Sequence, residues 1–185
     1  MRYRLAGLSV MALLLAGATR PAAAQARGYV GFGAGVSVPL GDFADDYKLG
    51  WLGQVVAGVT GASGKIGGRI DGMYARNALK GTGGFHLGLF GANADIVFTP
   101  GKRPAKVHPY ILGGVGFFNA KLGGPSGYTG GSSSTDFAWN LGAGIQIHTS
   151  SKMDFFTEAR FISISSDPSS TNFLPISIGI RWGGI

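Results

Sequence analysis

The chain has 185 residues, a formal net charge of +7, 34 glycines and no cysteine. The length fits a single domain, and the lack of cysteine excludes disulfide frameworks, thiolate metal sites and cysteine nucleophiles. Only 14% of the residues are charged, whereas soluble globular domains carry about 25%. The composition therefore departs from that of an ordinary soluble domain.

The first segment of the chain has the parts of a secretory signal peptide. Two arginines in the first four residues precede an apolar stretch, and Ala22-Ala23-Ala24 offers a small-residue cleavage site. The apolar stretch is shorter than the roughly 20 residues that a membrane-spanning helix needs. We expect a signal peptide over residues 1–24, with cleavage after Ala24 or Ala26, and a mature domain over 27–185. Its removal lowers the net charge to +4, so no nucleic-acid partner is expected.

The rest of the chain contains short segments in which apolar residues alternate with small or polar ones. Gly, Pro, Ser and Asp clusters separate these segments, which is the pattern of β-strands. Each is about as long as a tilted strand that crosses a bilayer. Eight strands are predicted, over residues 29–38, 51–59, 65–75, 85–98, 108–118, 136–147, 153–164 and 173–182.

The two faces of these segments differ in a way that favours a membrane barrel. In the clearest case the apolar face carries Phe137, Trp139, Leu141, Ala143, Ile145 and Ile147, and the other carries Ala138, Asn140, Gly142, Gly144 and Gln146. A soluble, lipocalin-like barrel would place the apolar face inside and show a charged face to water. Small residues with few charges suit a narrow interior instead, so we expect the apolar face to meet lipid.

The connections agree with an outer-membrane topology. Those after the odd-numbered segments are generally longer, as expected for external loops, and the even strand count places both termini in the periplasm. The longest, over 119–135, is rich in Gly and Ser and is predicted to be a mobile external loop. In segment 85–98 two leucines share a face with Asn93 and Asp95, so we expect a β-bulge near Gly91.

Three aromatic residues fall near predicted strand ends and are expected in an interfacial girdle: Trp51, Tyr74 and Trp182.

Several stretches resemble strands of a known family. They are His108-Pro109-Tyr110-Ile111-Leu112-Gly113-Gly114-Val115-Gly116-Phe117, Phe156-Thr157-Glu158-Ala159-Arg160-Phe161 and Ile178-Gly179-Ile180-Arg181-Trp182. The chain resembles the outer membrane protein β-barrel domain family, of the OmpA/OmpX type, over nearly all of its mature length. Together with the alternation, this implies an all-β fold: a closed antiparallel eight-stranded up-and-down transmembrane β-barrel in the cell outer membrane.

The resemblance also implies partners. They are outer-membrane lipids and lipopolysaccharide, together with the outer-membrane assembly machinery. Such barrels usually end on an aromatic residue that this machinery recognises, whereas here Trp182 is followed by Gly183, Gly184 and Ile185.

The charged residues fall into three predicted groups. The polar faces carry Arg69, Arg160 and Arg181 against Asp71, Asp95 and Glu158, with the amides Gln54, Asn93, Asn140 and Gln146. The external side carries Asp42, Asp45, Asp46, Asp136 and Asp167 against Lys48, Arg76, Lys80 and Lys121. The periplasmic side carries Arg27, Lys65, Lys102, Arg103, Lys106 and Lys152 against Asp154. We expect the first group to pair inside the barrel, because pairing makes buried charge tolerable, and we expect the periplasmic rim to be basic.

An enzymatic alternative arises from His148-Thr149-Ser150 and Glu158. Some small outer-membrane barrels are lipid A deacylases with a His-x-Ser pair and a downstream Glu. A serine nucleophile needs an adjacent imidazole and a third group that orients it, but His148 and Ser150 fall in a predicted periplasmic turn, away from lipid A. We therefore expect no enzyme, and no catalytic, cofactor-binding or metal-binding residues.

The predicted function is that of a small integral outer-membrane protein with a structural or surface-interaction role. Eight strands enclose too little space for an aqueous pore, so no open pore is expected, and the protein is predicted to be a monomer. Two alternatives stay open, a lipid A-modifying enzyme and a soluble periplasmic lipocalin-like binding barrel.

Overall fold

The computed structural model describes residues 26–81, 83–100, 105–125, 128, 131–150, 152–166 and 170–183. The predicted signal peptide, Lys102, Arg103, Asp167 and the last two residues lie outside this part of the chain. The strands are β1 (Arg27–Leu40), β2 (Gly50–Thr60), β3 (Ile66–Ala78), β4 (His86–Phe98), β5 (Val107–Gly123), β6 (Ser133–Ser150), β7 (Met153–Ile164) and β8 (Thr171–Gly183), with one short helix, α3 (Asp42–Asp46). No helix within the described ranges has the length and hydropathy of a membrane span.

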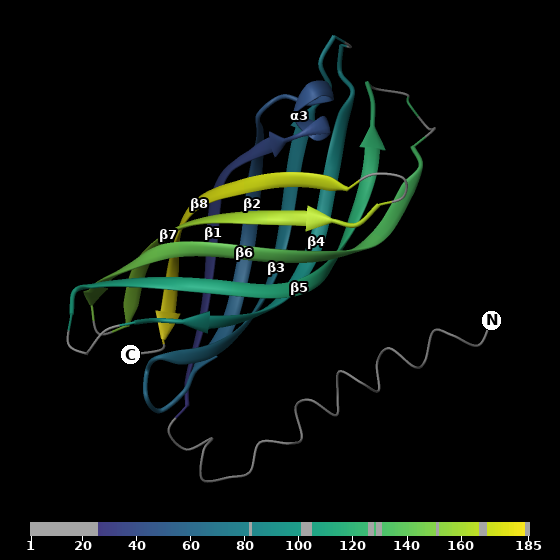
Figure 1. Ribbon diagram of the computed structural model, residues 1–185. Coiled ribbons are helices and arrows are strands. Elements are labelled where there is room, and N and C mark those ends of the chain that lie inside the picture. Colours follow the sequence, from purple (N-terminus) through teal and green to yellow (C-terminus); the bar gives the residue numbers. More distant parts are fainter. Residues whose placement is uncertain are drawn as a thin grey trace.

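The eight strands form one closed antiparallel barrel in sequence order (Figure 1). Closure is made by β1, which pairs with β2 on one side and with β8 on the other, from Tyr29 opposite Gly183 to Leu40 opposite Asn172. In lipid each unpaired backbone group would cost several kcal/mol, and a closed sheet leaves no strand edge. The predicted fold class is confirmed.

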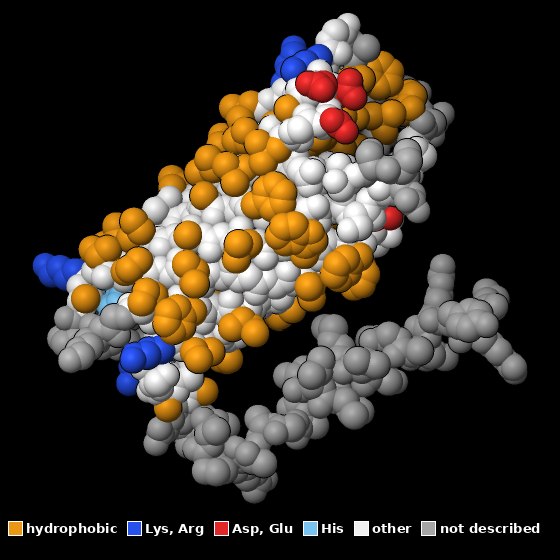
Figure 2. Space-filling view, in the orientation of Figure 1, with side chains coloured by type: hydrophobic (Ala, Val, Ile, Leu, Met, Phe, Trp, Pro, Cys, Tyr) orange, Lys and Arg blue, Asp and Glu red, His pale blue; other side chains and the backbone are white. Residues whose placement is uncertain are grey.

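The large apolar side chains point away from the barrel axis, as predicted. Val55, Phe90, Leu141 and Ile178 are 63%, 62%, 60% and 70% exposed on four different strands. Figure 2 shows this apolar surface along the body of the visible face, with basic and acidic side chains gathered toward its two ends. The outside of the barrel therefore matches lipid rather than water.

The predicted bulge near Gly91 is wrong. β4 pairs continuously with β3 and β5, and Leu89 points into the barrel with no exposed area. The leucine can face inward because the outer half of the interior is an apolar plug. Its members are Phe43, Leu52, Met73, Ala75, Leu89, Phe118, Ala138, Ile162, Ile164 and Phe173. The register shift in the sheet lies instead between β6 and β7, at His148 and Ser150.

The predicted external loop over 119–135 is shorter than expected. β5 continues to Gly123 and β6 begins at Ser133, and the side-chain amide of Asn119 donates to the Ser134 carbonyl oxygen (3.0 Å) and the Thr135 hydroxyl (2.9 Å). Sequence alternation could not reveal this extension, because the β6 side of the hairpin, Ser133 to Asp136, carries no apolar residue.

Aromatic residues lie near both ends of the barrel wall. Trp51 and Tyr74 contact each other at the outer ends of β2 and β3, with ring centroids 5.4 Å apart. Trp182 lies near the periplasmic end, with its ring centroid 5.5 Å from that of Phe32. These positions fit the predicted girdle at the two membrane interfaces.

Interior glycines make room for the long side chains of neighbouring strands, and this can be tested at Gly114. A Cβ at this position would collide with the backbone carbonyl oxygen of Ala94 and the carboxylate of Asp95. We predict that Gly114→Ala lowers the free energy of unfolding by about 1–3 kcal/mol, the usual cost of overpacking. Denaturant-induced unfolding in detergent, followed by heat-modifiable gel migration, measures the change.

The matched control is Gly53→Ala, because Gly53 faces outward on β2 and an added Cβ would meet nothing within 4 Å. Equal stability of the two variants would contradict the close packing of the interior.

Candidate functional site

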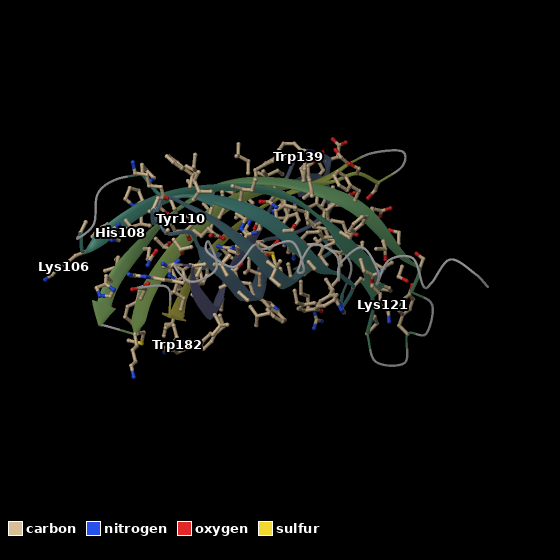
Figure 3. All side chains as sticks on the ribbon, turned by 90° about the horizontal axis from the view of Figure 1, so that it is seen from below. Lys106, His108, Tyr110, Lys121, Trp139 and Trp182 are labelled. Atoms are coloured by element: carbon tan, nitrogen blue, oxygen red, sulfur yellow. The ribbon has the colours of Figure 1, made fainter. Side chains whose placement is uncertain are left out.

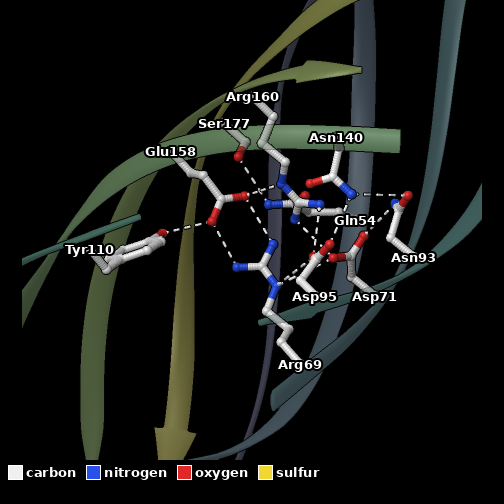
Figure 4. Close-up of polar contacts among 10 residues, drawn as sticks. All are labelled: Gln54, Arg69, Asp71, Asn93, Asp95, Tyr110, Asn140, Glu158, Arg160 and Ser177. Atoms are coloured by element: carbon white, nitrogen blue, oxygen red, sulfur yellow. Dashed lines mark hydrogen bonds and ion pairs between the residues drawn. The ribbon is translucent and has the colours of Figure 1, made fainter. Parts of the chain in front are cut away.

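A network of five charged side chains crosses the middle of the barrel below the apolar plug (Figure 4). Its members are Arg69, Asp71, Asp95, Glu158 and Arg160, each at most 6% exposed. They come from β3, β4 and β7, and period-two alternation turns each of them inward. Ion pairs therefore join opposite walls of the barrel.

The two guanidinium groups share the three carboxylates. Arg69 donates Nη1–H and Nη2–H to the two Glu158 oxygens, at 2.7 and 2.9 Å, in a bidentate pair. Arg160 donates Nε–H to Glu158 (2.6 Å), Nη2–H to Asp71 (2.9 Å) and Nη1–H to Asp95 (3.3 Å). The predicted internal pairing of these five residues is confirmed.

Neutral side chains complete the network. The amides of Asn93 and Asn140 donate to Asp71 (3.0 Å) and Asp95 (2.8 Å), as the polar-face pattern predicted. The hydroxyl of Tyr110 donates to Glu158 Oε2 at 2.8 Å, a contact that the sequence analysis missed. The signal was present in the strand alternation, since Tyr110 shares its face with Leu112, Gly114 and Gly116.

A second cluster lies near the periplasmic end, around Asp154. This residue was expected at the periplasmic surface, but its side chain is fully buried. Its Oδ2 accepts hydrogen bonds from Arg181 Nε (3.0 Å) and from the amide of Gln146, and its Oδ1 lies 2.7 Å from His148 Nδ1. The Arg181 guanidinium also lies over the Tyr29 ring, 4.6 Å from the centroid.

This cluster corrects the predicted charge distribution. Arg181 does not join the central network, and among the described residues the interior holds four carboxylates instead of three. The cause is register, because His148, Asp154 and Arg181 lie side by side on β6, β7 and β8. Asp154 shares the inward face of β7 with Phe156, Glu158 and Arg160. The alternation of that strand therefore already indicates that Asp154 lies inside the barrel.

Two residues of the enzymatic alternative, His148 and Glu158, are held in separate clusters. Glu158 is engaged by two guanidinium groups and a phenol, while His148 contacts Asp154. The side chain of Ser150 lies outside the described part of the structure. Among the described residues, no group of three His, Asp or Glu side chains is arranged to hold a metal ion.

Little space remains in the barrel below the central network. A cavity of about 20 Å³ lies there, bordered by Tyr29, Arg69, Tyr110, Gln146 and Arg181 among others. This is room for about one water molecule. The structure thus combines a lipid-compatible wall with a filled interior, which defines the class of small outer-membrane β-barrels.

The comparisons with known proteins agree with this class. The model of the outer membrane protein beta-barrel domain family matches residues 9–181, so the chain belongs to that family. The protein is accordingly located in the outer membrane. No curated protein sequence matches the chain.

Solved structures show the same fold. Neisserial surface protein A is 15% identical with a TM-score of 0.66, and the match covers 84% of this chain and 96% of that one. OprG from Pseudomonas aeruginosa is 13% identical with a TM-score of 0.58, over 86% and 95% of the two chains. Ail, the attachment invasion locus protein of Yersinia pestis, is 17% identical with a TM-score of 0.53, over 85% and 99%.

The central network can be tested by removing one charge. Glu158→Gln leaves Arg69 and Arg160 buried with the carboxylates of Asp71 and Asp95 alone. We predict a loss of about 3–5 kcal/mol in the free energy of unfolding, the cost of breaking a buried ion pair. Denaturant-induced unfolding in detergent measures it.

The control is Asp45→Asn, on the exposed side of α3, where a change within about 0.5 kcal/mol is expected. Equal stability of the Glu158→Gln variant and the control would show that the network does not hold the walls together.

Proposed function

We propose that the protein is a monomeric, non-conducting barrel that anchors a surface-interaction site in the outer membrane. The observation that carries the proposal is the filling of the interior by two successive layers. An ion that crossed the barrel would have to displace both the apolar plug and the charged network.

The outer layer is closed by aromatic packing. Phe118 and Phe173 meet edge to face with ring centroids 5.9 Å apart, and neither has any exposed area. Phe43 of α3 is also buried in the plug, and its centroid lies 4.7 Å from that of Tyr47. Burial raises the pKa of the Tyr47 phenol, and the Asp46 carboxylate acts in the same direction. The helix thus covers the outer end of the barrel.

The same end displays the residues available to a partner. Asp42, Asp45 and Asp46 are exposed on and around α3, and Leu49 is 61% exposed beside them. Tyr128 is 40% exposed and contacts Phe85, with centroids 5.3 Å apart. Mixed acidic and apolar exposure at one end supports a role in surface contacts.

A catalytic role is not part of the proposal. The His, Ser and Glu of a deacylase-like constellation would have to lie together, yet Glu158 is held in the central network and His148 in the Asp154 cluster. We also propose that residues 1–24 are a signal peptide and that the assembly machinery inserts the barrel.

Conductance across a planar lipid bilayer tests the closed interior. We predict no discrete current steps for the purified protein, because both layers block the axis. A 16-stranded porin reconstituted in the same way supplies the positive control, and heat-modifiable migration confirms that the sample is folded. Stable unit currents from the folded protein would contradict the proposal.

A further inference from the structure

We propose that Arg76 and Lys121 form a binding site for the phosphate group of an outer-leaflet lipid, on the outside of the barrel wall near its outer end. The site rests on the membrane orientation of the proposed function but not on the closed interior. Figure 3 shows Lys121 at the opposite end of the barrel from Lys106 and His108.

Strand register brings the two basic residues onto one row of the wall. Arg76 of β3 lies opposite Gly88 of β4, and Gly88 lies opposite Lys121 of β5. Paired residues face the same side of a sheet, and neighbouring strands are about 4.8 Å apart. The Cα atoms of Arg76 and Lys121 are therefore about 10 Å apart, a spacing that two long side chains can close around one phosphate.

The position between them is buried and carries no side chain of its own. Gly88 has no side chain, and the Tyr74 hydroxyl lies 3.2 Å from the place that a Cβ would take there. Two residues further out on β4, His86 Nδ1 lies 3.2 Å from Arg76 Nη2 and 3.4 Å from the Gly84 carbonyl oxygen. The guanidinium, the ammonium and the phenol thus flank Gly88 on the outer face of the wall.

The charges at this site lack the carboxylate partners that the three arginines inside the barrel have. Arg69, Arg160 and Arg181 each contact a carboxylate, whereas no carboxylate in the described part of the chain lies within 4.0 Å of Arg76 or Lys121. Both side chains are exposed. A phosphate supplies the missing anion, and arginine binds phosphate by two parallel hydrogen bonds.

The surface below the row identifies the phosphate as part of a lipid. Trp51 lies opposite Arg76, and its ring contacts Tyr74, so the site lies at the level of the outer aromatic girdle. Toward the membrane centre the same wall exposes Phe90 (62%) and Phe117 (61%). A phosphorylated lipid can therefore place its head group on the two cations and its acyl chains on the apolar wall.

Native mass spectrometry of the full barrel with bound lipid provides the test. The wild-type protein and the double variant Arg76→Gln/Lys121→Gln are each mixed with bisphosphorylated lipid A or with phosphatase-treated lipid A. We predict that the double variant retains phosphorylated lipid A roughly 30-fold less than wild type, on the basis of two basic residues near a charged head group. Retention of the dephosphorylated lipid is expected to be unchanged.

The matched control is Lys65→Gln/Lys106→Gln, which removes the same charge from exposed lysines at the periplasmic end. Wild-type retention in this control supports the site. Equal loss in both double variants, or wild-type retention in Arg76→Gln/Lys121→Gln, would overturn it. Heat-modifiable migration checks folding, and the bilayer recordings test the closed interior separately, so failure of one proposal does not imply failure of the other.

Discussion

Closure of the sheet is the constraint on which the rest of this structure depends. Because a spanning strand in lipid must pair on both sides, β1 joins β8 and the chain encloses a narrow interior. That interior must then be filled with side chains from alternate residues of every strand. The outward residues meet the opposite requirement and, away from the two ends of the barrel, are mainly apolar, with the exposed Thr157 of β7 as a polar exception.

The interior meets this constraint with different chemistry at different depths. The outer half is an apolar plug, the middle is an ion-paired network, and the periplasmic end holds the Asp154 cluster. Long side chains in the lower two layers require small neighbours, so the Cβ that Gly142 lacks would lie 2.6 Å from Arg160 Cγ. The high glycine content thus reflects the size of the residues beside each glycine.

Period-two alternation was enough to predict the strands, their lipid-facing sides and the five-residue network. In a membrane barrel every strand has one face toward lipid and one toward the interior, so the same alternation applies to all of them. Three features followed other rules. Leu89 faces inward since the polar interior gives way to an apolar plug, Asp154 is buried through its register with His148 and Arg181, and the β5–β6 hairpin extends beyond the apolar stretches. Contacts between distant strands, such as Tyr110 with Glu158, depend on how the sheet closes.

The central claim is that the apolar face of each strand meets lipid, and spin labelling tests it most directly. The chain has no cysteine, so single cysteines at Val55, Leu141 and Ile178 carry a nitroxide at outward positions on three strands. In lipid vesicles the account predicts more frequent collisions with oxygen, which is concentrated in lipid, than with a water-soluble nickel chelate at all three sites. Preferential collision with the nickel chelate at these positions would contradict the membrane barrel.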